Sequence, residues 1–123
     1  MAEDKRIIGW LVDQKQRVEL LQQFPPRYKT IVADHVTLES GTDAPLPEAT
    51  IGEIIGRADD DEGVEALIVS IDGSTDRPGG GTYHITWSLA EGREARESND
   101  VIDKEGWADL DLPEPVTLHP AEF

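Results

Sequence analysis

The chain contains no cysteine and a single methionine. Without cysteine it can form no disulfide, no thiolate metal site and no cysteine nucleophile. No apolar run approaches the roughly 18 residues needed to cross a membrane. The N-terminal segment 1–6 is mixed in charge and leads into no signal-like apolar stretch. These absences favour a cytoplasmic protein, and we expect no association with a membrane.

Basic residues are also scarce, with 11 Lys and Arg against 26 Asp and Glu and a net charge of −15. Because an acidic surface repels polyanions at long range, we expect no extended tracking along RNA or DNA. A small anionic substrate, or one strand end held in a local basic pocket, is compatible with this charge. The ordinary interpretation of the acidity is solubility, for example in a high-salt cytoplasm. A second interpretation is nucleic-acid mimicry, in which the acidic surface occupies the nucleic-acid-binding site of another protein.

At 123 residues the chain has the length of one domain, which we place over residues 1–123. One helix is predicted over 13–24. Asp13 can cap this helix, with Gln16 in the capping-box position, and Pro25-Pro26 ends it. The apolar face of the helix is expected to contain Val18, Leu20, Leu21 and Phe24.

The rest of the chain has mainly the pattern of strands. The run 66–71 is the strongest, and we expect it to form a hairpin with 50–57 across the acidic turn 59–63. Further expected elements are strands over 29–39 and 82–89, a short helix from about 98 to 104, and a last edge strand over 115–119 bounded by prolines. These elements predict an α+β fold in which strands outnumber helices.

A four-residue pattern occurs twice, as His35-Val36-Thr37-Leu38 and as His84-Ile85-Thr86-Trp87. The chain has three histidines, and two of them lie in these matched frames. Residues i and i+2 of a strand share a face, so each motif presents an imidazole beside a hydroxyl and directs two apolar side chains into the core. If the two strands are neighbours, both His–Thr pairs face one pocket.

Such a pocket is suited to opening a cyclic phosphate without a metal ion or cofactor. Histidine titrates near neutral pH, so one imidazole can accept a proton from water while the other protonates the leaving ribose oxygen. The hydroxyls of Thr37 and Thr86 can then hydrogen-bond the phosphate oxygens as charge builds on them. We therefore expect His35, Thr37, His84 and Thr86 to be catalytic; the pattern leaves open which histidine is the base.

The paired motifs resemble those of the 2H phosphoesterase superfamily. The segment 94–99, Glu-Ala-Arg-Glu-Ser-Asn, is similar to the stretch after the second motif in the cyclic phosphodiesterase domain of fungal tRNA ligases. This resemblance implies a 2H-phosphoesterase-like fold, a mainly antiparallel sheet with few helices around a central cleft and a reduced second lobe. It also implies catalytic roles for the two histidines and two threonines, a 2′,3′-cyclic phosphate on an RNA end or a nucleotide as substrate, and a 2′-phosphate product.

Three arginines near the second motif are candidates for binding an anionic substrate. Arg77 precedes three glycines whose backbone N–H groups could approach a phosphate, although the same glycines suit a plain hairpin turn. Arg93 and Arg96 follow the motif strand, and each could instead pair with a nearby glutamate on the surface. The third histidine, His119, has no motif around it and is expected on the surface.

Two other functions are compatible with the same residues. The pocket could hold a cyclic nucleotide without cleaving it, or the acidic surface could act as a nucleic-acid mimic that inhibits a partner. The first alternative differs from the enzyme in that a cyclic nucleotide is bound but not converted to product. The second predicts that the His–Thr pairs are dispensable and the acidic residues are not.

Overall fold

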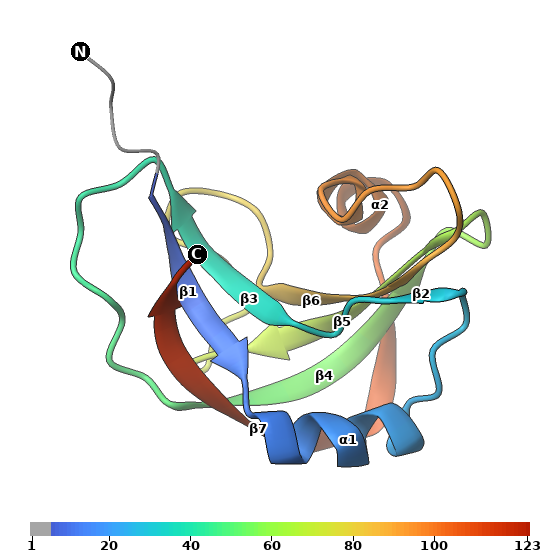
Figure 1. Ribbon diagram of the computed structural model, residues 1–123, viewed down its shortest axis with the longest axis horizontal. Coiled ribbons are helices and arrows are strands. Elements are labelled where there is room, and N and C mark those ends of the chain that lie inside the picture. The colour runs from blue at the N-terminus through green and yellow to red at the C-terminus, as the bar shows by residue number, and fades with distance from the viewer. Residues whose placement is uncertain (1–5) are drawn as a thin grey trace.

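The computed structural model describes residues 6–123. Residues 1–5, part of the N-terminal segment considered above, lie outside this range. Within the described chain, no helix is long and apolar enough to span a membrane. The elements are β1 Ile7–Val12, α1 Gln14–Gln23, β2 Thr30–Ile31, β3 His35–Ser40, β4 Ile51–Asp59, β5 Val64–Ser70, β6 His84–Leu89, α2 Glu97–Glu105 and β7 Ala108–Glu122 (Figure 1).

Six antiparallel strands close into a barrel, in the order β6-β3-β1-β7-β4-β5 with β5 pairing back to β6. The short strand β2 adds to the free part of the β6 edge, and the chain is 47% strand and 16% helix. The expected α+β fold of 2H-phosphoesterase type, with a central cleft and a reduced second lobe, is therefore wrong. Closure depends on the β5–β6 ladder, which joins Val64 to Leu89 and Ile68 to His84 and makes the sheet continuous.

The barrel interior is the main hydrophobic core. Trp10 and Trp87 are its largest side chains, and each satisfies its indole N–H with a carbonyl oxygen at 2.8 Å, from Ala49 and Phe24 respectively. Most of the other core residues come from the strands, because every second residue of a strand points inward, and Leu20 comes from α1. The other fully buried members include Val12, Leu20, Val36, Ile54, Leu67, Val69, Ile85 and Leu118. A smaller cluster on the outer surface packs α2 against β4 and β5 through Ala58, Ala66, Ile68 and Ile102.

The predicted first helix is confirmed as α1, with Asp13 at its N-cap accepting a hydrogen bond from the Gln16 N–H at 3.1 Å. Its apolar face is narrower than predicted. Leu20 and Phe24 are buried, whereas Val18 is 58% exposed. The Gln16 side chain binds the β7 backbone at Pro115 O instead of completing a capping box, and so ties the helix to the barrel.

The predicted strand 29–39 is two strands in the structure. Ala33 has φ 44, in the left-handed region, so the extended backbone is interrupted between β2 and β3. The N–H groups of Val32 and Ala33 still bind β6, at Trp87 O and Thr86 O. The break therefore lets the chain turn while it stays on the barrel wall.

The last strand is longer and more central than predicted. β7 runs from Ala108 to Glu122 and pairs with both β1 and β4, so it is not an edge strand. The prolines suggested an edge because proline cannot donate to a ladder. Pro113 falls in the stretch between Asp109 and Glu114 where the β4 ladder is interrupted, so the strand accommodates it there.

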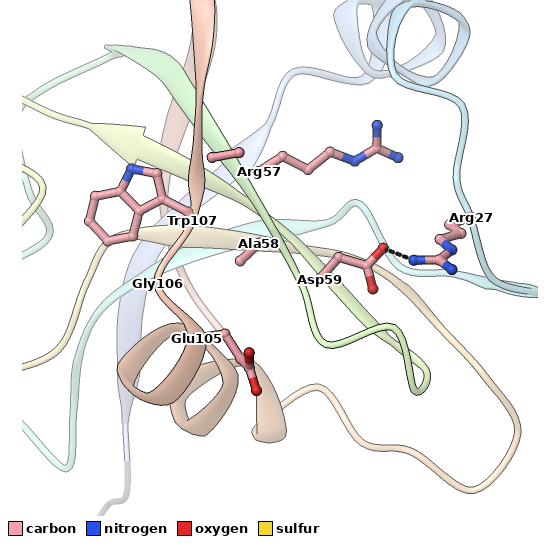
Figure 2. Close-up of a pocket in the computed structure, with 8 residues that line it drawn as sticks. Arg27, Arg57, Ala58, Asp59, Glu105, Gly106 and Trp107 are labelled. Carbon is pink, nitrogen blue, oxygen red and sulfur yellow. Dashed lines mark hydrogen bonds and ion pairs between the residues drawn. The ribbon is translucent and has the colours of Figure 1, made fainter.

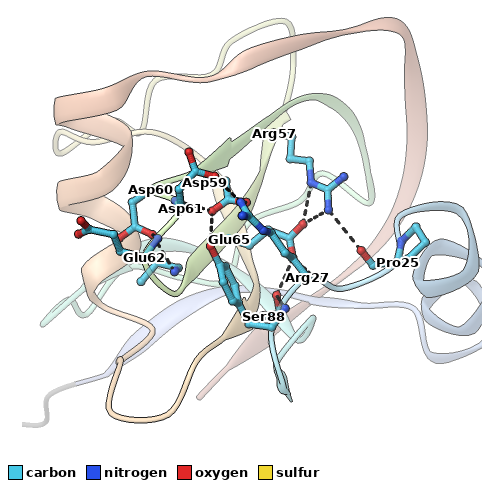
Figure 3. Close-up of polar contacts among 11 residues, drawn as sticks. Pro25, Arg27, Arg57, Asp59, Asp60, Asp61, Glu62, Glu65 and Ser88 are labelled. Carbon is cyan, nitrogen blue, oxygen red and sulfur yellow. Dashed lines mark hydrogen bonds and ion pairs between the residues drawn. The ribbon is translucent and has the colours of Figure 1, made fainter.

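A buried carboxylate holds the segment after α1 against the barrel (Figure 3). Glu65 on β5 is 0% exposed and pairs with the Arg57 guanidinium, whose Nε lies 2.6 Å from Oε2. Its other oxygen accepts hydrogen bonds from Ser88 Oγ at 2.5 Å and from the Arg27 N–H at 3.0 Å. Arg57 also donates to Pro25 O at 3.2 Å. The carboxylate thus links two barrel strands, β4 and β6, to the connection between α1 and β2.

Candidate functional site

The two His–Thr motifs lie on neighbouring antiparallel strands. β3 and β6 pair with Val36 opposite Ile85, the second residue of each motif. This pair sets the two motifs side by side on the barrel wall, while the Thr86 carbonyl accepts the Ala33 N–H at 2.9 Å.

The histidines and threonines project from the outer face of the barrel wall. Val36 and Ile85 are fully buried in the interior core, so the residues on either side of them face outward. On that face there is a cavity of about 240 Å³. The residues that line it are His35, Thr37, Ser40, Arg77, His84, Thr86, Ala95, Arg96 and Asn99. The structure thus brings all four motif residues to one cavity, together with two of the three candidate arginines.

His84 is held in a defined tautomer. Its Nδ1 lies 2.8 Å from Thr82 O, which can only accept, so Nδ1 carries the proton and Nε2 keeps its lone pair in the neutral ring. Burial lowers the pKa of His84 below its ordinary value of 6.5, against the opposing effect of the Thr82 hydrogen bond. The positive charge of Arg77 and the nearby His35 lower this pKa further. At neutral pH His84 is therefore an uncharged base.

His35 has the opposite electrostatic surroundings. Its Nδ1 lies 3.1 Å from the Asp34 carboxylate, and its side chain is 32% exposed. A carboxylate at this distance complements a positively charged imidazole. The ring of Phe123 packs against the imidazole with 4.6 Å between the ring centroids.

The two threonines are not equivalent. Thr37 lines the cavity on β3. The Thr86 hydroxyl donates to Ala95 O at 3.3 Å and lies 2.9 Å from Ser98 Oγ, and both Thr86 and Ser98 are buried. Thr86 therefore fixes the beginning of α2 on the barrel.

Arg77 is brought to the cavity by the turn between β5 and β6. Backbone hydrogen bonds between Arg77 and residues 80 and 81 close the turn, where Gly80 and Gly81 have φ of 110 and 91. These positive φ values explain the glycines, because residues with a Cβ rarely adopt them. The guanidinium Nε donates to Leu38 O at 3.2 Å, which holds the side chain beside β3. The glycines therefore form a turn between β5 and β6, as the second of our two interpretations of them expected.

The other two arginines differ in position. Arg96 lines the cavity, and its Nε lies 2.6 Å from the Glu94 carboxylate on an exposed surface. Arg93 does not line it. Its guanidinium binds Glu97, Asp60 and the Glu62 carbonyl, at 2.9, 3.0 and 2.6 Å. The structure therefore places Arg93 apart from the other two candidate arginines, because these partners hold it at the acidic turn and at the beginning of α2.

Three polar residues of the site were not predicted from the sequence. Ser40 and Asn99 line the cavity, and Asp34 contacts His35. Asp34 could have been noticed because it directly precedes a motif histidine. Asn99 belongs to the segment 94–99 that carried part of the resemblance, where no role was assigned to it, and its amide donates to Arg96 O at 3.1 Å. The third histidine is on the surface as expected, paired with Asp13 at 2.8 Å.

A larger cavity than the one at the motifs lies over β4 and the connection from α2 to β7 (Figure 2). It measures about 630 Å³, and Trp107, Arg57 and Arg27 are among the residues that line it. Both arginines are already paired, Arg57 with Glu65 and Arg27 with Asp59 and Asp61. Both arginines are therefore neutralised, and the acid–base groups of this cavity are the carboxylates of Asp59 and Glu105, with no histidine in its lining.

Nothing among residues 6–123 groups three or more His, Asp or Glu side chains closely enough to hold a metal ion. The cavity at the motifs is lined by imidazole, hydroxyl, guanidinium and amide groups and by the methyl group of Ala95. The chain matches no protein-family model, no curated protein and no solved structure, so its function has to be argued from this cavity.

Proposed function

We propose that the protein is a metal-independent phosphodiesterase that opens 2′,3′-cyclic phosphates on nucleotides or RNA ends by general acid–base catalysis. The observation that carries this proposal is the Val36–Ile85 pairing, which sets two His–Thr motifs beside each other above one cavity. The resemblance to 2H phosphoesterases is restricted to these motifs and to segment 94–99, because the barrel is not the fold of that superfamily. The proposal therefore rests on the site and not on the fold.

His84 is the general base in this scheme. Its Nε2 has a lone pair because Nδ1–H is bound to Thr82 O, and its lowered pKa keeps the ring neutral. Nε2 takes a proton from a water molecule as the water oxygen bonds to phosphorus. A bond then breaks between phosphorus and one ribose oxygen.

His35 is the general acid. In the imidazolium form its Nδ1–H is bound to the Asp34 carboxylate, which leaves Nε2–H to protonate the departing ribose oxygen. The product is a phosphomonoester, and proton exchange with solvent restores both rings. The two rings differ in the partner of Nδ1, a backbone carbonyl for His84 and the Asp34 carboxylate for His35, and we assign the two roles on this difference.

The phosphate would be held by Arg77, Arg96 and the Thr37 hydroxyl, which surround the histidines in the cavity. The Arg77 guanidinium supplies local positive charge in a chain of net charge −15, and Arg96 would add to it by exchanging its Glu94 partner for the phosphate. Thr86 does not bind the phosphate in this scheme, because its hydroxyl is already bound to residues 95 and 98. Its role is to position the segment before α2. It keeps Arg96 and Asn99 at the cavity.

The test is product analysis. Incubation of the protein with nucleoside 2′,3′-cyclic phosphates in excess chelator should yield nucleoside monophosphates, detected by phosphorus NMR, which also identifies the 2′ or 3′ product. Binding without turnover would contradict the proposal and favour a protein that only sequesters the nucleotide. Turnover that disappears on chelation would contradict the metal-independent mechanism.

The pH dependence of kcat/KM should reflect the lowered pKa of His84. The base is active when deprotonated, so activity should persist below pH 6.5 and fall only at more acidic pH. Arg77→Gln removes a positive charge that lowers this pKa, so the acid limb should move to higher pH. Arg77→Lys keeps the charge and is the matched control. An acid limb that stays in place in Arg77→Gln would exclude His84 as the titrating base.

A further inference from the structure

An aromatic ring flanks the catalytic cavity beside His35. Phe123 packs on the imidazole with 4.6 Å between centroids and an angle of 51° between the planes. Its N–H donates to Ile7 O at 2.8 Å, which fixes the backbone at the end of β7 beside β1. In Figure 1 this end of the chain lies next to β1 and β3, the strand that carries His35.

Phe123 differs from the other aromatic side chains in its exposure. It is 39% exposed, and among residues 6–123, which hold every aromatic residue of the chain, it is the only one in the exposed class. Trp10, Phe24, Tyr83 and Trp87 are buried, and Tyr28 and Trp107 are half-buried. One exposed apolar side chain is ordinary on a protein surface, so its position beside a catalytic imidazole is the informative observation.

We infer that Phe123 is a stacking platform for the nucleobase of the substrate; this inference rests on the proposed phosphodiesterase function. A 2′,3′-cyclic phosphate and the base are attached to the same ribose, at O2′/O3′ and C1′. A phosphate held at His35 and His84 therefore sets the base about one sugar ring away. The ring that flanks His35 is suitably placed to receive it on its exposed side.

The rest of the cavity offers no comparable face. The residues that line it are polar, apart from Ala95, which has only a methyl group, and Phe123 lies at its border through the contact with His35. Arg77 and Arg96 are suited to the phosphate. Aromatic stacking contributes about 1–3 kcal/mol per base and tolerates every base because each has a π-face. The site is thus selective for nucleoside cyclic phosphates over other cyclic phosphodiesters, with little preference among bases.

The experiment compares two substrates that differ only in the base, a nucleoside 2′,3′-cyclic phosphate and methyl riboside 2′,3′-cyclic phosphate. The wild type should show a KM about 10-fold lower for the nucleoside substrate. Phe123→Ala and Phe123→Leu should remove this difference by raising the nucleoside KM alone, and Phe123→Trp should preserve it. Leu112→Ala, an exposed apolar change on the same strand, is the control and should alter neither KM.

Three outcomes would overturn the inference. If the wild type opens both substrates with equal KM, the stacking role of Phe123 is contradicted, whereas the phosphodiesterase function is supported. If Phe123→Leu lowers kcat equally for both substrates, the ring only supports His35. If the wild type opens neither substrate, the proposed function falls and the subsite with it.

Discussion

Replacing His84 with alanine should lower kcat/KM for cyclic phosphate opening by about 10²–10⁴-fold, the usual contribution of a general base. The reason is that Nδ1 of His84 is fixed on Thr82 O, so Nε2 keeps its lone pair, and burial lowers the pKa of this ring, which lines the cavity. Initial rates with a nucleoside 2′,3′-cyclic phosphate measure the loss. His119→Ala is the matched control, because His119 is exposed and paired with Asp13 outside the cavity, and it should retain the full rate.

His35→Ala should cause a similar loss with the natural type of leaving group, since a ribose oxygen departs slowly unless it is protonated. A phosphodiester with a nitrophenoxide leaving group needs no such proton. His35→Ala should therefore recover most of its activity on that substrate, whereas His84→Ala should not. Recovery by His84→Ala alone would reverse our assignment of acid and base. Full activity in both variants would end the proposal of histidine catalysis.

Replacing Glu65 with leucine should lower the free energy of unfolding by about 1–3 kcal/mol, the cost of leaving buried donors without an acceptor, since the Arg57 side chain is 36% exposed and can be hydrated. The Arg57 guanidinium, the Ser88 hydroxyl and the Arg27 N–H would all lose their carboxylate acceptor (Figure 3). Urea denaturation measures the change as a lower midpoint at an unchanged m-value.

Glu53→Leu is the control for this prediction, since Glu53 is an exposed glutamate on the neighbouring strand β4. It should change the unfolding free energy by no more than about 0.5 kcal/mol. Unchanged stability in Glu65→Leu would mean that the network of Figure 3 contributes little to the fold.

Several elements could be predicted because their signals are local. The Asp13 cap and Pro25-Pro26 bound α1, and the runs on either side of the acidic turn pair as β4 and β5. The buried residues 36, 85 and 87 follow from strand alternation. The left-handed backbone at Ala33 and the length of β7 had no such signal, because both depend on pairing with strands distant in the sequence.

The fold class could not be predicted for the same reason. A barrel and an open antiparallel sheet use the same strand pattern, and they differ only in whether the first and last strands of the sheet meet. Here the β5–β6 ladder closes the sheet, and no short-range feature of either strand specifies its partner. The resemblance of the motifs suggested a different scaffold, but two tetrads and one short segment constrain a site and not the chain around it.

The sequence by itself determined which side chains could act together within each strand. The period of two in a strand makes His35 co-facial with Thr37 and His84 with Thr86, whatever sheet contains them. Only the tertiary structure decided that Val36 lies opposite Ile85, that Arg96 reaches the cavity while Arg93 is held by acidic partners, and that Phe123 packs on His35. Strand periodicity is a property of the local backbone, whereas pairing, register and side-chain partners depend on which distant segments the closed barrel brings into contact.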